Sequence, residues 1–417
     1  MRALTKQFRG IIALMMLSIC VTSCLELLGD EPDTTPNIGH EFQLNGINFR
    51  VTDPYKKTLE VTPKGSFSNS YSGEIYIPSN IVYMEEKYTV TSIANKAFYD
   101  CDGLASVTIP NSVTEIGDNA FCDCDGLTLI KLSNSLTTIG NYAFYDCDGL
   151  ASITIPNSVT EIGNNAFYDC DGLTSITLPD SLNTIRSYTF YHCDRMTSIS
   201  FPNSITTIEN NAFSECSRLT SIELPNSLTT IGDNAFSYCL GLTSIVLPNS
   251  LTTIGENTFY DCDGLTSINL PNSLTTIGNN AFTGCSRLTK VNYNAENCSS
   301  MGSSSHLVFR NCDALKVVNV GDQVKTIPSY MFYNCTSLNQ INLGKSVSKI
   351  GDYAFYMCFN TTKIYSKALT PPTCGKYALD DIRKSSCQLF VPTSTLSKYK
   401  AADTWKEFRN ISEDSSL

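Results

Sequence analysis

A unit of 23 residues recurs along most of this chain, and it constrains the fold more than any other sequence feature. From residue 97, AFYDCDGLASVTIPNSVTEIGDN is followed by AFCDCDGLTLIKLSNSLTTIGNY and then by AFYDCDGLASITIPNSVTEIGNN. Self-similarity at a fixed period of this size is the signature of a repeat architecture. One phenylalanine marks each unit, with a spacing of 23 except for 27 between the ninth and tenth: Phe98, Phe121, Phe144, Phe167, Phe190, Phe213, Phe236, Phe259, Phe282, Phe309, Phe332 and Phe355.

Each unit encodes one short strand and a tight return. In the first unit Val107-Thr108-Ile109 alternates with the strand period of two, and Pro110 ends the strand because proline cannot donate to a ladder. A unit of this size cannot bury its own apolar face, so units must stack about 4.8 Å apart, as hydrogen-bonded strands do. The sequence therefore predicts a repeat solenoid over residues 97–365, with about 12 rungs of 23 residues, short parallel strands and a longer rung at 282–309.

Both ends of the solenoid are predicted to be capped, because terminal repeats need a polar outer cover. Residues 41–96 form the N-terminal cap, with a hairpin at Asn45-Gly46 and one degenerate rung. Residues 366–417 form the C-terminal cap, with a strand at 389–392 and a following helix that begins after Thr393 or Ser394.

The rung pattern L-x-x-I-x-L-P-x-S-[LV]-x-x-I-G-x-x-A-F-x-x-C resembles the BspA-like class of leucine-rich repeats over about residues 91–365. Departures are scattered, such as Met196 for Leu, Ser133 for Pro and Thr189 for Ala. The resemblance implies a leucine-rich repeat solenoid in a bacterial surface lipoprotein of the adhesin type. Proteins of the host or of neighbouring cells are the partners that it implies.

The N-terminus has the pattern of a secretory address. Residues 1–23 combine basic residues with an apolar run from Ile11 to Val21, and Val21-Thr22-Ser23-Cys24 resembles the lipobox of bacterial lipoproteins. We expect a lipoprotein signal peptide at 1–23, lipidation of Cys24 and an acidic, proline-bearing tether at 24–40. The predicted location is the cell envelope, on the outer membrane or cell surface, with the lipid anchor as the only membrane attachment.

Eighteen cysteines are many for a chain of 417 residues, and twelve of them lie three residues after each phenylalanine, from Cys101 to Cys358. A single cysteine per rung does not supply the converging pairs that a zinc site needs. Neighbouring rungs lie within disulfide range, but the position is inward, so we predict free buried thiols. Cys374 and Cys387 in the C-terminal cap are the pair predicted to form a disulfide.

The sequence contains no constellation for catalysis. G-x-S-x-G, H-E-x-x-H and P-loop motifs are absent, and the three histidines lie in unrelated positions. We therefore expect a protein without enzymatic activity and without a cofactor. The net charge of −11 argues against nucleic acid as a partner.

The exposed strand position between two inward residues is the predicted binding face. Solenoids bind extended or convex partners on such a face, where every rung adds one adjustable contact to a rigid surface. The scaffold positions repeat, whereas this position varies among Lys131, Thr154, Thr177, Glu223, Val246, Asn269 and Tyr365. Tyr293 in the longer rung is a further candidate, although its register is that of an inward residue.

Paired aspartates flank the ladder cysteines of the first rungs, at Asp100, Asp102, Asp123, Asp125, Asp146, Asp148, Asp169 and Asp171. Stacked carboxylates about 5 Å apart repel, and Ca²⁺ would relieve that repulsion. A solvated Asp-Gly turn explains the same residues, and the pairing lapses in the next rungs, so no metal is assigned.

Two functions follow. The first is a cell-surface, lipid-anchored leucine-rich repeat protein that mediates protein–protein interaction or adhesion to host or neighbouring-cell proteins. The alternative is an accessory glycan-binding lipoprotein of a polysaccharide uptake system, which requires aromatic platforms such as Tyr293 and Tyr365.

Overall fold

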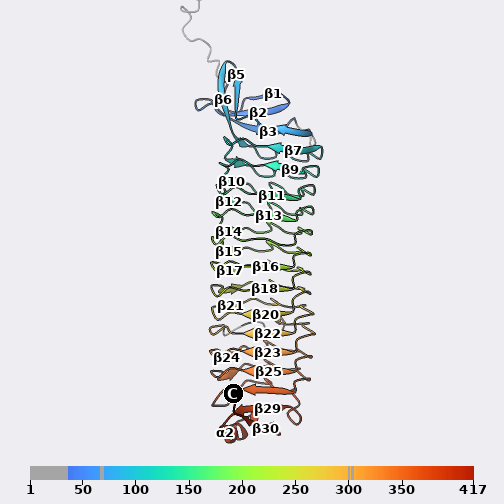
Figure 1. Ribbon diagram of the computed structural model, residues 1–417, viewed down its shortest axis with the longest axis vertical. Helices are drawn as coiled ribbons and strands as arrows, with labels where there is room; N and C mark the ends of the chain where they lie inside the picture. Colours follow the sequence, from blue (N-terminus) through green and yellow to red (C-terminus); the bar gives the residue numbers. More distant parts are fainter. Residues whose placement is uncertain (1–35, 66–69, 299–300, 302–304) are drawn as a thin grey trace, which may run out of the picture.

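The computed structural model is a solenoid in which the rungs stack in one direction between two caps (Figure 1). It describes residues 36–65, 70–298, 301 and 305–417. The predicted signal peptide at 1–23 and the predicted lipidation site Cys24 lie outside these residues. The solenoid has about fourteen turns rather than twelve, because strands within both caps continue the stack.

One strand of each rung joins a column that we call the front column. Its strands are parallel and in register, so that a residue pairs with its equivalent in the next rung; Thr177 and Glu223 are bridged by Ser200. The short strands follow from the single alternation before each proline. They are β7 (Leu104–Thr108), β9 (Leu129–Lys131), β11 (Ser152–Thr154), β13 (Ser175–Thr177), β16 (Ser221–Glu223), β18 (Ser244–Val246), β20 (Ser267–Leu270), β22 (Lys290–Tyr293), β23 (Val317–Val320), β25 (Gln340–Leu343) and β27 (Lys363–Ser366).

A second column of two-residue strands, the side column, forms after the proline turn. Each contributes one exposed or half-buried polar residue and one buried apolar residue, except the last, where Cys374 replaces isoleucine. The members are β8 (Glu115–Ile116), β10 (Thr138–Ile139), β12 (Glu161–Ile162), β14 (Thr184–Ile185), β15 (Thr207–Ile208), β17 (Thr230–Ile231), β19 (Thr253–Ile254), β21 (Thr276–Ile277), β24 (Thr326–Ile327), β26 (Lys349–Ile350) and β28 (Thr373–Cys374).

The third side of each rung, which we call the turn edge, runs from the end of the side column back to the front column. Its backbone also bonds from rung to rung, as where Phe98 N donates to Ala120 O at 2.7 Å and Asp100 N donates to Cys122 O at 2.8 Å. Residues such as Asp100 and Asn119 adopt the left-handed conformation here, with φ of 54° and 55°. Aspartate and asparagine are the non-glycine residues that tolerate this conformation best.

The phenylalanines form a continuous stack inside the solenoid. Neighbouring rings lie 4.9–5.6 Å apart between centroids, with planes 1–18° from parallel. Leucine, isoleucine and valine from the front and side columns complete one core that extends through every rung. The recurring phenylalanines are therefore structural residues of the core.

The ladder cysteines are free and buried, as predicted. Ten of the twelve thiols donate to the phenylalanine carbonyl of the preceding rung at 3.0–3.3 Å, for example Cys170 to Phe144. The predicted disulfide is wrong, because Cys374 and Cys387 are also free. Cys374 belongs to the side column, whereas Cys387 precedes a strand of the front column, so the two thiols lie in different columns of the solenoid.

The longer rung keeps the register of the front column. Strand β22 pairs with β23 so that Lys290 lies opposite Val317 and Tyr293 opposite Val320. The additional residues are therefore accommodated after the strand. Tyr293 is fully buried and its hydroxyl donates to Cys298 O at 2.9 Å. The candidate role of Tyr293 in ligand binding is wrong, since its ring is part of the core.

The N-terminal cap is a small sheet laid on the first rung. Strands β1 (Glu41–Leu44) and β2 (Ile47–Asp53) are antiparallel about Asn45-Gly46, and β2 continues antiparallel to β3 (Thr58–Thr62). Strands β5 (Asn80–Tyr83) and β6 (Glu86–Ile93) form a second hairpin, and β6 joins β8 of the side column. Strand β4 (Gly73–Tyr76) extends the front column beyond β7.

The C-terminal cap continues the front column with two strands. Strand β29 (Gln388–Pro392) pairs with β27, and β30 (Asn410–Asp414) pairs with β29, both parallel. Between them lie the short helix α2 (Leu396–Ala401), which begins after Thr395, and the 3-10 turn η1 (Trp405–Glu407). Tyr399, Trp405 and Phe408 are buried over the last rungs. Strand β30 was not predicted, because its residues lack an apolar alternation.

Candidate functional site

The front column carries the predicted binding position on the outside of the solenoid. From Lys131 to Asn269 the side chains at this position are exposed, and the apolar Val246 is 73 % exposed. Val246 is thus an apolar side chain on an otherwise polar face. The predicted residues that lie exposed on this face are Lys131, Thr154, Thr177, Glu223, Val246 and Asn269.

An asparagine ladder occupies the same position in the later rungs. The amide of Asn319 donates to the side-chain oxygen of Asn292 at 2.7 Å, and the amide of Asn342 donates to that of Asn319 at 2.5 Å. These asparagines are half-buried, unlike the exposed residues of the earlier rungs. The front column thus carries separate exposed side chains in its earlier rungs and a hydrogen-bonded row of amides in its later rungs.

Tyr365 ends this row and lies against the C-terminal cap. Its ring stacks on Phe390 with centroids 4.6 Å apart and planes 10° from parallel, and the Tyr365 side chain is half-buried. A groove of 390 Å³ adjoins this pair, and its lining includes Asn342, Leu343 and Lys367. The groove therefore offers a ligand the Tyr365 ring, amide groups and a cation.

The predicted aspartate row lies on the turn edge. Ligand atoms of Asp125, Asp146 and Asp148 come within 4.8 Å of one another, and so do those of Asp169, Asp171 and His192. Neither of these two groups, as found among the described residues, includes Asp100, Asp102 or Asp123. The structure therefore brings together only the later part of the predicted calcium row.

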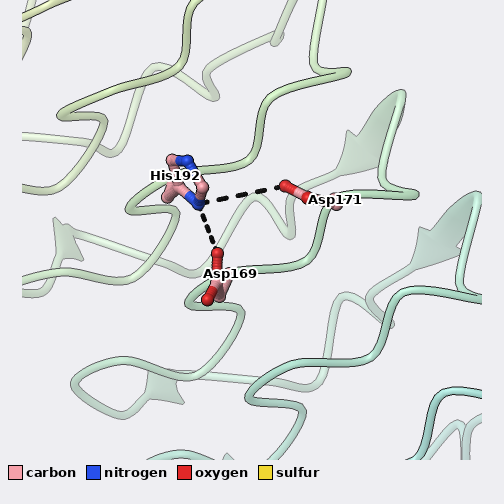
Figure 2. Close-up of side chains that lie close together, drawn as sticks. All are labelled: Asp169, Asp171 and His192. Atoms are coloured by element: carbon pink, nitrogen blue, oxygen red, sulfur yellow. Dashed lines mark hydrogen bonds and ion pairs between the residues drawn. The ribbon is translucent and has the colours of Figure 1, made fainter.

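His192 ends the aspartate row in the fifth rung. Its Nδ1 bonds to the Asp169 carboxylate and lies 4.0 Å from Asp171 Oδ1 (Figure 2). Its Nε2 lies 3.8 Å from Asp194 Oδ2. The hydrogen bond to Asp169 raises the pKa of His192. The positive charge of the imidazolium form offsets the negative charges of the carboxylates around it. This is a local electrostatic reason for histidine at a place where sister rungs have aspartate.

Asp146 is the carboxyl group that the row perturbs most clearly. Partial burial, with the neighbouring charges of Asp148, Asp169 and Asp125, raises the pKa of Asp146 to about 6. A raised carboxyl pKa means that ionisation is less favourable in the folded than in the unfolded state. The row therefore costs stability at neutral pH.

Replacing Asp146 by Asn should stabilise the protein at pH 7.5 by up to about 1 kcal/mol, a figure reduced for solvent screening. The gain should vanish below about pH 4, where Asp146 is protonated in the unfolded state as well. Urea unfolding at both pH values measures the difference. Asp180→Asn, with the same change of charge on an exposed turn, is the control. Equal effects of Asp146→Asn at both pH values would contradict the assignment.

Sequence reasoning missed a group of tyrosines on the turn edge. Tyr142, Tyr145, Tyr168, Tyr188 and Tyr191 form a chain of ring contacts with centroids 4.6–6.4 Å apart. The signal was the recurrence of tyrosine directly after phenylalanine and directly before alanine or threonine.

The fold is a leucine-rich repeat solenoid, and its front column is an exposed face. The model of the BspA type Leucine rich repeat region matches residues 91–217, 183–306 and 303–395 in 6 copies. The chain belongs to the BspA-type leucine-rich repeat family. This family consists of proteins that typically act in protein interaction without enzymatic activity, and its members are commonly proteins of the bacterial cell surface.

Two solved structures illustrate the similarity. A leucine-rich repeat protein from Bacteroides ovatus is 30% identical, with a TM-score of 0.60, over 90% of this chain and 100% of that one. A leucine rich cell surface protein from Faecalibacterium prausnitzii is 24% identical, with a TM-score of 0.51, over 93% of this chain and 96% of that one, and supports the fold alone. No protein with curated function matches the chain. None of the helices in the described part has the length and apolar character that a membrane span requires.

Proposed function

We propose that this protein is a lipid-anchored adhesin that binds host or neighbouring-cell proteins through the front column. The exposed, varied column on an otherwise repetitive scaffold is the observation that carries the proposal. Lipidation at Cys24 and the tether at 24–40 would hold the solenoid away from the membrane. Location on the cell surface agrees with what is common in the family.

Rigidity supports recognition by this face. The front column, the side column and the turn edge each bond from rung to rung, and the phenylalanine stack fills the space between them. Backbone held in this way loses little conformational entropy when a partner binds. Along the front column, Lys131, Glu223 and Val246 differ in charge and polarity. An extended or convex protein partner can therefore make a different contact at each of several rungs.

A glycan is the other candidate, and the groove beside Tyr365 and Phe390 is what favours it. Stacked rings offer an apolar platform, and Asn319 and Asn342 offer amide groups next to it. Burial of Tyr293 removes the second platform on which this alternative depended. The groove is therefore a local site at one end, whereas the exposed column extends over many rungs.

Binding of the full-length protein, purified in detergent, to arrays of extracellular matrix and serum proteins and of polysaccharides tests the proposal. We expect saturable protein binding that falls at least roughly tenfold in the triple variant Lys131→Ala/Glu223→Ala/Val246→Ala. Tyr365→Ala is the matched control and should retain it. Binding to polysaccharides alone, abolished by Tyr365→Ala, would overturn the adhesin in favour of the glycan reader. Dependence on Ca²⁺ would assign a ligand to the aspartate row.

A further inference from the structure

The turn edge carries an aromatic surface that lies on a different side of the solenoid from the front column. We call Tyr142, Tyr145, Tyr168, Tyr188 and Tyr191 the tyrosine patch. Its rings contact one another across three successive rungs, and the Tyr145, Tyr168 and Tyr191 rings stack with centroids 5.0 and 4.6 Å apart. A depression of 570 Å³ lies between Tyr142 and Tyr188.

Two members of the patch occupy a conformation that disfavours tyrosine. Tyr142 and Tyr188 have φ of 56° and 58°, in the left-handed region. The same place in sister rungs is taken by asparagine, as at Asn119, Asn165 and Asn211, and asparagine adopts this conformation more readily. The two rings remain 40 % and 37 % exposed, so a ligand can reach them. The fold does not require tyrosine here. Tyrosine also occupies this place at Tyr330 and Tyr353, so the acidic surroundings, and not the backbone conformation alone, distinguish the patch.

Carboxylates surround the tyrosine patch. Tyr191 donates its hydroxyl to Glu215, and Asp146 and Asp169 are among the charges that raise the pKa of Tyr145, after burial. Residues 97–196 contain thirteen aspartates and glutamates against three lysines and arginines. This part of the solenoid therefore attracts cations and repels anions.

The chain itself shows that the turn edge accepts a cation on its tyrosines. Lys96 Nζ lies over the Tyr99 ring at 5.5 Å from the centroid, and Lys376 Nζ lies over the Tyr377 ring at 5.0 Å. Tyr99 precedes the patch by two rungs, and Tyr377 lies far along the same edge. Among the described residues, no lysine or arginine lies over a ring of the patch. Tyr168 is stacked between Tyr145 and Tyr191, so the rings available to a cation from another molecule are those of the more exposed Tyr142 and Tyr188.

We propose that the tyrosine patch binds an arginine-rich segment of a protein partner. A guanidinium group stacks on an aromatic face and pairs with a carboxylate in the same plane, whereas an ammonium group is a more strongly hydrated point charge. Three rungs span about 10 Å, which is the length of about three residues of extended chain. The patch therefore holds a short basic segment, and this site is independent of the front column.

The test uses the full-length protein in detergent and two fluorescent peptides, hexa-arginine and hexa-lysine, with binding followed by anisotropy at physiological salt. We expect hexa-arginine to bind more tightly than hexa-lysine. The double variant Tyr142→Asn/Tyr188→Asn changes no charge and restores the residue of the sister rungs. It should lower the affinity for hexa-arginine by roughly three- to thirtyfold, the range expected for two partly exposed cation–π contacts.

The controls separate this site from charge alone and from the front column. Tyr330→Asn/Tyr353→Asn makes the same change at the same edge, also in the left-handed conformation but away from the acidic rungs, and should leave binding intact. Asp169→Asn should weaken the binding of both peptides. Thermal unfolding of the patch variant verifies its fold, and Tyr168→Ala provides a second variant.

Unchanged hexa-arginine affinity in both patch variants would overturn the proposal, as would equal binding of the two peptides. Loss of polysaccharide binding in these variants, without any peptide binding, would overturn it in favour of a glycan.

Discussion

Phe213→Ala is expected to lower the free energy of unfolding by about 3–5 kcal/mol, the usual cost of removing a buried phenylalanine ring. Phe213 is fully buried and stacks between Phe190 and Phe236 at 5.3 and 5.4 Å, with the edge of Phe201 against it at 5.7 Å. The rungs on both sides are held by backbone bonds, so they cannot close the cavity fully. Urea unfolding followed by circular dichroism measures the change.

Val246→Ala is the matched control for this experiment. Val246 lies on the outside of the front column one rung away from the Phe213 site, and its removal should change the stability by no more than about 0.5 kcal/mol. A loss of less than about 1 kcal/mol for Phe213→Ala would mean that the phenylalanine stack contributes little to the free energy of unfolding, and that the backbone hydrogen bonds of the columns stabilise the solenoid.

Trp405→Ala should have an effect of similar size, but confined at first to one end. The indole is fully buried, its Nε1 donates to Pro372 O at 2.7 Å, and its ring packs edge-on against Tyr399 at 5.5 Å. Its loss should cost about 3–5 kcal/mol and detach the cap from the last rungs. Because each rung contacts only its neighbours, the last rungs should then open before the rest.

Limited proteolysis with mass spectrometry measures this local opening, and new cleavage sites are expected after residue 366. Trp405→Phe keeps most of the packing and removes the hydrogen bond, so it should lose only about 1–2 kcal/mol. Cleavage spread evenly along the solenoid of Trp405→Ala would show that the molecule unfolds as one unit and would contradict a capping role.

The repeat alone was enough to predict most of the fold. The period set the spacing of Phe213 and its equivalents, the proline marked the end of each front strand, and the register of Tyr293 already indicated an inward side chain. These features depend on local pattern, which every rung restates. The exposure of Lys131 and Val246 followed from the same alternation.

Features that depend on contacts between columns or on non-repeating residues could not be predicted from the sequence. Cys374 and Cys387 are close in sequence, but Cys374 lies in a strand of the side column, whereas Cys387 directly precedes a strand of the front column. Strand β30 extends the front column by pairing with β29, although its own residues do not alternate. The tyrosine patch has a signal in the sequence, but the left-handed turns that hold Tyr142 and Tyr188 are not evident from the period.

The register of the front column also bears on how such a chain can change its length. Every rung bonds to its neighbours through equivalent atoms, and the 27-residue rung shows that residues can be added after a strand while Lys290 and Tyr293 keep their partners. Removal or duplication of one whole rung, in genomes or by design, would therefore shift the C-terminal cap by about 5 Å and leave every remaining contact type intact. The number of copies therefore sets the distance between the two caps, in steps of one rung.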